Sequence, residues 1–155
     1  MGHYRCVGKT MKLIEIAPRI YLRGNLSRVQ NLSESLQAAG IDVVVRLVTP
    51  NIAVTGVTFI YFPIADGRLR AETTESLEKL ADDLFGYWQQ GKRIVITCNM
   101  GRNRAALLTT LVVSRALKLS YSDSMALVRA RRPNALANKH FERYIIERST
   151  LWKTQ

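Results

Sequence analysis

Short runs of β-branched and aliphatic residues alternate with longer stretches of helical periodicity along most of this chain. Residues 43–48 and 93–97 have the length and the apolar character of strands buried on both faces of a sheet. Between two such runs, apolar side chains recur at helical spacing from Leu77 to Trp88. This alternation predicts an α/β fold, a single domain with a central, mostly parallel sheet flanked by helices.

The expected elements follow one another closely along the chain. Strands are expected at residues 13–16, 20–22, 43–48, 58–63 and 93–97, and helices at residues 77–88, 103–117, 122–131 and 138–152. A capping-box pattern at residues 27–30 predicts one further helix, which passes through Leu32 and Leu36 and ends at Gly40. Gly91 and Pro133 separate later elements.

The N-terminal segment differs from the rest of the chain. Residues 1–12 lack the apolar core of a signal peptide, and we expect them to form a flexible leader before a catalytic domain of residues 13–155. No run approaches the roughly 18 apolar residues that a membrane span requires. We therefore expect a cytoplasmic protein without a membrane span, and the sequence does not predict an oligomeric state.

The chain is strongly basic. Its 23 Lys and Arg residues against 12 Asp and Glu residues give a net charge of +11. Such a field attracts anionic partners, among them phosphorylated proteins, nucleic acid and anionic lipid. A solvated basic surface that serves only solubility is the alternative.

Cysteine and histidine are scarce. Cys6 and Cys98 are too few for a disulfide scaffold, and with only His3 and His140 besides them we expect no zinc site, no other metal and no cofactor. Cys6 lies in the leader, where an incidental role is the simplest interpretation, although a redox pair with Cys98 stays open.

The candidate catalytic residues lie where the strand expected at residues 93–97 meets the following helix. Cys98 ends the strand, the loop residues Asn99, Met100, Gly101, Arg102 and Asn103 follow, and Arg104 begins the helix. The start of a helix binds a dianion and favours the thiolate, the reactive form of cysteine. Gly101 allows a tight turn, and the planar guanidinium of Arg104 matches two phosphate oxygens. The segment predicts a nucleophile in a phosphate-binding loop, the alternative being a buried cysteine beside solvated arginines.

This segment resembles the signature loop of the protein tyrosine phosphatase superfamily, and specifically of its compact dual-specificity branch. Residues 20–26 are similar to that branch's opening strand and turn, and residues 40–45 to the next helix end and strand. Arg132-Pro133, followed by Asn138 and Phe141, matches its closing pattern. The resemblance implies a phosphatase that hydrolyses phosphotyrosine of proteins through a phosphocysteine intermediate, and it leaves phosphoserine and phosphothreonine open as further substrates.

The resemblance also implies a general acid in a loop about thirty residues before the cysteine. Asp66 lies 32 residues before Cys98, after an expected strand and before Gly67. Such an acid protonates the departing oxygen, which leaves poorly as an alkoxide or phenolate. An Asp-Gly turn without a chemical role is the alternative, and Glu72 is the nearest substitute acid.

Two positions depart from the family's pattern. Thr97 stands where the family usually has a histidine that helps to fix the loop, and Ala105 stands where it usually has a hydroxyl that stabilises the departing cysteine sulfur. The second change is expected to slow hydrolysis of the phosphocysteine. Neither change removes Cys98, Arg104 or Asp66.

Three other functions stay open. Gly101, Asn103 and Arg104 are similar to the loop of cysteine-dependent RNA triphosphatases, which makes an RNA 5′ end a possible substrate for so basic a chain. The changes at Thr97 and Ala105 are compatible with a non-catalytic phosphate-binding module. A rhodanese-like sulfurtransferase also places cysteine on a strand-to-helix loop, but Asp66 and the closing pattern are not expected in one.

Overall fold

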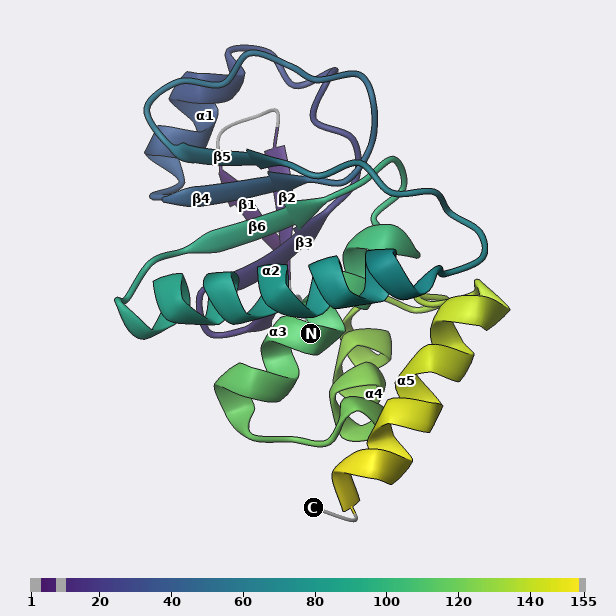
Figure 1. Cartoon of the computed structure of the whole chain (residues 1–155). Helices are drawn as coiled ribbons and strands as arrows, with labels where there is room; N and C mark the ends of the chain where they lie inside the picture. The colour runs from purple at the N-terminus through teal and green to yellow at the C-terminus, as the bar shows by residue number, and fades with distance from the viewer. Residues whose placement is uncertain (1–3, 8–10, 154–155) are drawn as a thin grey trace.

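A computed structural model of the protein describes residues 4–7 and 11–153, and one six-stranded sheet runs through it (Figure 1). Its strands, in the order β1-β2-β3-β6-β4-β5, are β1 (Tyr4–Val7), β2 (Met11–Ala17), β3 (Ile20–Arg23), β6 (Ile94–Thr97), β4 (Val43–Arg46) and β5 (Thr58–Tyr61). The strands β3, β6, β4 and β5 are parallel, and β1 and β2 add an antiparallel edge. The predicted single-domain α/β fold with a mostly parallel sheet is confirmed.

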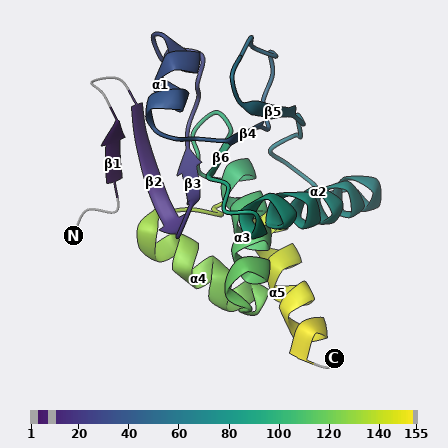
Figure 2. The same cartoon turned by 90° about the vertical axis from the view of Figure 1, so that its left-hand side faces the viewer.

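Helices cover both faces of the sheet (Figures 1 and 2). One face carries α1 (Leu32–Ala38), and the other carries α2 (Ala71–Gln89), α3 (Arg104–Leu117), α4 (Tyr121–Arg131) and α5 (Lys139–Lys153). Every residue of α3 from Ala105 to Ser114 is buried, which fits a helix that is apolar around most of its circumference. None of the described helices is long and apolar enough to span a membrane.

Strand β6 lies in the middle of the sheet and separates two hydrophobic clusters. Ile94 and Ile96 join the cluster beneath α2–α5, whereas Val95 joins the cluster beneath α1. Alternate side chains of a strand point to opposite faces, so a strand buried on both faces is apolar throughout. This burial holds the C-terminal end of β6, and with it Cys98, in a fixed place.

The predicted capping box was wrong. Helix α1 begins only at Leu32, after Asn31, whose backbone is left-handed (φ 51°) and whose side chain caps nothing. The backbone N–H of Ser27 donates instead to the side chain of Asn25, and Val29 N–H donates to Leu26 O. Because the side chains of Leu26 and Val29 are buried, tertiary packing holds this stretch as turns.

The expected leader, residues 1–12, also contains regular structure. Strand β1 lies inside that range and pairs with β2, and β2 itself begins at Met11. The side chain of Met11 is buried in the cluster beneath α1. The side chain of Cys6, and with it the suggested redox pair with Cys98, lies outside the described part of the chain.

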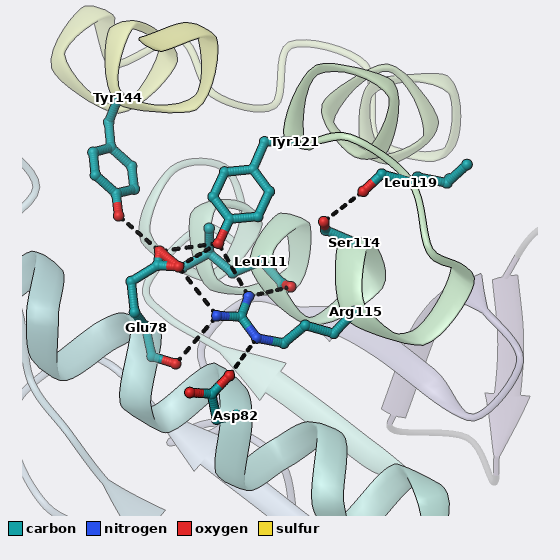
Figure 3. Close-up of polar contacts among 8 residues, drawn as sticks. All are labelled: Glu78, Asp82, Leu111, Ser114, Arg115, Leu119, Tyr121 and Tyr144. Atoms are coloured by element: carbon teal, nitrogen blue, oxygen red, sulfur yellow. Dashed lines mark hydrogen bonds and ion pairs between the residues drawn. The ribbon is translucent and has the colours of Figure 1, made fainter. Parts of the chain in front are cut away.

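A polar cluster ties α2, α3, α4 and α5 together on the side of the molecule that carries these helices (Figure 3). The carboxylate of Glu78 accepts hydrogen bonds from the hydroxyls of Tyr121 and Tyr144 and pairs with the guanidinium of Arg115, at 3.1 Å. Arg115 also pairs with Asp82 at 2.7 Å and donates to Leu111 O. Four helices thus share one hydrogen-bonded centre.

Candidate active site

The end of β6 is held from both sides. Strand β6 pairs with β3 on one side and β4 on the other, and all four of its residues are buried. The Thr97 hydroxyl donates to Val45 O at 2.8 Å, and Leu47 N–H donates to Thr97 O. Cys98, which follows at once, is a free thiol with only 2% of its surface exposed. The residue that replaces the family's histidine is therefore bonded into the sheet.

Two glycines allow the loop after Cys98 to pack against the loop after β3. Gly101 has φ +64°, and a Cβ there would lie 2.9 Å from the backbone of Arg23 and Gly24. A Cβ on Gly24 would lie 3.2 Å from Asn99 O. Any side chain at Gly101 would force these two backbone segments apart.

Three carbonyl groups of this loop accept hydrogen bonds from residues outside it. Asn99 O accepts from Asn25 N–H at 2.9 Å, Met100 O from the Arg132 guanidinium at 3.1 Å and Arg102 O from Leu136 N–H at 2.8 Å. No backbone amide of residues 99–104 donates a hydrogen bond to any of the described residues. The loop thus keeps a set of unpaired N–H donors at the start of α3, as an anion site requires.

Arg104 lies at the first position of α3, half-buried. Its guanidinium donates to Ile64 O at 3.2 Å, in the segment that leads to Asp66. It pairs with no carboxylate of the described residues. Its charge therefore remains available to an anion.

Asp66 lies in the exposed loop between β5 and α2 and is joined to the phosphate loop. Its Oδ2 accepts from Asn103 Nδ2 at 3.0 Å, and its Oδ1 accepts from Asn138 Nδ2 at 2.8 Å. Asn103 in turn accepts from the backbone N–H of Asn138 through Oδ1, at 3.1 Å. The structure thus brings Asp66 to the same loop as Cys98 and Arg104, whereas Glu72, on the first turn of α2, makes no described contact with that loop.

Asn138 has a second role as the N-cap of α5. Its Oδ1 accepts from His140 N–H at 2.9 Å and from Phe141 N–H at 3.3 Å, and the Phe141 side chain is fully buried. The closing pattern of the sequence therefore fixes the start of α5 beside Asp66. Its link to Asp66 is a contact that the sequence analysis did not anticipate.

The structure also shows a buried arginine, Arg46, within the strand that the sequence predicts at residues 43–48. Arg46 is fully buried at the end of β4 and donates to Pro50 O at 2.8 Å and to Asn25 Oδ1 at 3.1 Å. Burial lowers the pKa of its guanidinium. Because the backbone N–H of Asn25 donates to Asn99 O, Arg46 is linked through Asn25 to the loop after Cys98. A charged residue inside an otherwise apolar strand was the available signal.

The remaining candidate residues lie around the loop. Met100 is 65% exposed, Arg102 donates to Asn134 O at 3.1 Å, and Ala105 is fully buried in the same hydrophobic cluster as Cys98. Two arginines at the end of α4 differ: Arg132 contacts the loop, while Arg129 pairs with Glu142 at 2.6 Å.

Comparison with known proteins identifies the family. Residues 20–150 match the model of the family described as "Dual specificity phosphatase, catalytic domain". No curated protein sequence matches the chain. Among solved structures, human DUSP28 is 22% identical with a TM-score of 0.76, covering 91% of this chain and 98% of its own.

Two further structures share the fold. A mouse putative dual specificity phosphatase complexed with zinc tungstate is 23% identical, with a TM-score of 0.76 and coverage of 92% of this chain and 89% of its own. A human tyrosine phosphatase-like serine/threonine/tyrosine-interacting protein is 21% identical, with a TM-score of 0.74 and coverage of 90% and 97%. Because the family model matches most of the chain, this protein belongs to the dual specificity phosphatase family and is a cysteine-dependent protein phosphatase.

Proposed function

We propose that this protein hydrolyses phosphotyrosine, and phosphoserine or phosphothreonine, in proteins through a phosphocysteine intermediate. The observation that carries the proposal is the loop at residues 99–104, whose carbonyls are bonded outward and whose amides are unpaired beside Cys98. Donors fixed in this way stabilise the charge that develops on the equatorial phosphate oxygens without reorganising during the reaction.

In the first step, the Cys98 thiolate attacks phosphorus and forms an S–P bond as the bond between phosphorus and the ester oxygen breaks. The guanidinium of Arg104 and the loop amides hold the three remaining oxygens. Asp66, in its protonated form, transfers its proton to the departing oxygen. Its place beside Asn103 and Asn138 supports this role, because the two amides fix the direction of the carboxyl group.

In the second step, water attacks phosphorus and breaks the S–P bond. The Asp66 carboxylate takes one proton of that water, which restores the acid, and phosphate leaves with Cys98 again a thiolate. The mouse relative with bound zinc tungstate is consistent with this chemistry, since tungstate is a tetrahedral oxyanion like phosphate.

The test compares wild type with Cys98→Ser in phosphate release from phosphopeptides and in binding of tungstate. Cys98→Ser is expected to abolish turnover while tungstate binding persists, because the loop amides and Arg104 remain. Acid-quenched wild type should carry one phosphate on Cys98, identified by mass spectrometry. Turnover near the wild-type rate in Cys98→Ser would contradict the phosphocysteine, and tungstate binding without turnover in wild type would indicate a binding module.

A further inference from the structure

A groove of about 470 Å³ lies between the segment that leads into α2 and the first turns of α5. Figure 1 shows the start of α2 near the start of α5. Its basic lining residues are Arg68, Arg70, His140 and Arg143. Glu147 is the one carboxylate among the lining residues. The lining is therefore cationic; it includes no residue of the loop after Cys98 and shares only Tyr144 with the Glu78 cluster.

The arginine side chains in this groove are unpaired within the described part of the chain. The guanidinium groups of Arg68, Arg70 and Arg143 are exposed, and none makes a hydrogen bond or ion pair with a described residue. Arg70 also occupies the N-cap of α2 without a side-chain cap, so the unpaired amides and positive end of a 19-residue helix point to the same region. Like charges held together without partners repel one another, and an anion would relieve that repulsion.

The groove is continuous with the candidate active site along the chain. Arg68 follows Asp66 by two residues, and His140 follows Asn138 by two residues. Asp66 and Asn138 are hydrogen-bonded to each other, and Asn138 also donates to Gly67 O at 3.1 Å. A phosphoprotein bound with its target phosphate at Cys98 would therefore pass the acid loop before reaching the arginines.

We propose that this groove binds a second anionic group of the phosphoprotein substrate, either an acidic side chain or another phosphate, a few residues from the phosphate that is hydrolysed. The inference rests on the proposed phosphatase function. A protein is favoured over single-stranded RNA because RNA recognition uses aromatic side chains on which bases stack. The aromatic lining residues are His140 and Tyr144, and Tyr144 is half-buried, with its hydroxyl donating to Glu78 at 2.7 Å.

The experiment uses synthetic peptides that share one phosphotyrosine and have neutral flanks. In separate series, a glutamate or a phosphoserine is placed at each of the four positions on either side. The groove variant is Arg68→Ala, Arg70→Ala and Arg143→Ala combined. Its control is Arg28→Ala, Lys79→Ala and Arg148→Ala combined, which removes the same charge from exposed positions outside the groove.

With wild type, at least one acidic position should raise kcat/KM about tenfold over the neutral peptide, since each exposed charge pair contributes a factor of a few. The groove variant should lose this advantage, whereas the control keeps it. The advantage should decrease with added salt. Both variants should hydrolyse p-nitrophenyl phosphate and the neutral peptide at the wild-type rate. The glutamate and phosphoserine series distinguish a carboxylate from a phosphate as the natural group.

Equal kcat/KM for neutral and acidic peptides in wild type would overturn the inference, as would a loss shared by the control. A groove-dependent advantage confined to 5′-triphosphorylated RNA would replace the phosphoprotein with a nucleic acid. A wild type that hydrolyses none of the peptides, neutral or acidic, contradicts the proposed function itself, which separates the two failures.

Discussion

The two ends of α3 each carry an arginine, and the two arginines are used in opposite ways. At the start of the helix, Arg104 makes one hydrogen bond, to a backbone carbonyl, and pairs with no described carboxylate. In the last turn, Arg115 pairs with Glu78 and Asp82 and also donates to Leu111 O and Tyr121 (Figure 3). Burial opposes the charge of Arg115, but its hydrogen bonds outweigh this and raise the pKa of its guanidinium.

This difference separates stability from function within one helix. Where every donor is satisfied inside the protein, as at Arg115, the contacts stabilise the packing of four helices. The proposed function assigns the opposite role to the start of the helix, where the loop amides are unpaired and Arg104 makes one hydrogen bond, so that these donors would bind phosphate. Substitutions at the start of α3 should therefore change the kinetics, and substitutions in its last turn should change the free energy of unfolding.

The largest effect is expected for Asp66→Asn at the active-site end. Loss of the proton donor should slow peptide phosphates and alkyl phosphates by about a hundredfold to ten-thousandfold. p-Nitrophenyl phosphate should be affected much less, because its phenolate leaves without a proton. Steady-state kinetics on both substrate types measure the contrast, with Glu72→Gln as the control. Equal losses on both types would assign the acid to another residue.

Lysine substitutions at the two arginines test the comparison directly. Arg104→Lys should lower kcat/KM on the order of a hundredfold with little change in stability, because an ammonium group cannot form the bidentate contact with phosphate. Arg115→Lys should instead lower the free energy of unfolding by about 1–3 kcal/mol and leave the kcat/KM of the folded protein near wild type. Urea melts and kinetics on both variants provide the readouts. A reversed pattern would mean that the two ends have been assigned the wrong roles.

A burst experiment with Ala105→Ser gives a smaller effect. If the missing hydroxyl slows departure of the Cys98 sulfur, rapid mixing of wild type with p-nitrophenyl phosphate should release nearly one equivalent of phenolate before the steady state. Ala105→Ser should shrink this burst and raise the steady-state rate a few-fold. Identical kinetics in the two proteins would show that another group already stabilises the sulfur.

The smallest effect concerns the Arg115 end at alkaline pH. Burial and the hydrogen bond to Glu78 raise the pKa of Tyr121 from about 10 to about 12. A raised pKa contributes stability that is complete below pH 10 and is lost as the pH rises through about 12. Tyr121→Phe should therefore be less stable than wild type by about 1 kcal/mol at pH 8, with the gap narrowing above pH 10. Urea melts at pH 8 and pH 11 measure it, and a constant gap would contradict the assignment.

The active-site loop could be predicted because its determinants are local. A buried strand, a cysteine at its end, a glycine and a helix start lie within a few residues, and each restricts the backbone directly. The family match over residues 20–150 confirms the family that the loop and the flanking motifs indicated. The roles of Cys98, Arg104 and Asp66 stay predictions until the kinetics are measured.

Tertiary structure decided what lies far apart in the sequence. Asp66 contacts Asn103 and Asn138, which are 37 and 72 residues away, and no local pattern encodes such a contact. The groove likewise combines arginines from the segment before α2 with an arginine from α5. In the sequence alone, each of them has the pattern of an ordinary solvated surface residue.

Local and tertiary preferences conflicted in only a few places. Residues 27–30 have the pattern of a helix start, yet burial of Leu26 and Val29 holds them as turns. Arg46 would weaken a strand on its own, but Asn25 and Pro50 accept its hydrogen bonds inside the protein. The local sequence determines the conformation of a segment where its own backbone restrictions outweigh the contacts that the rest of the chain could offer. Elsewhere the free energy of burial and of long-range hydrogen bonds, available only in the folded chain, decides the structure.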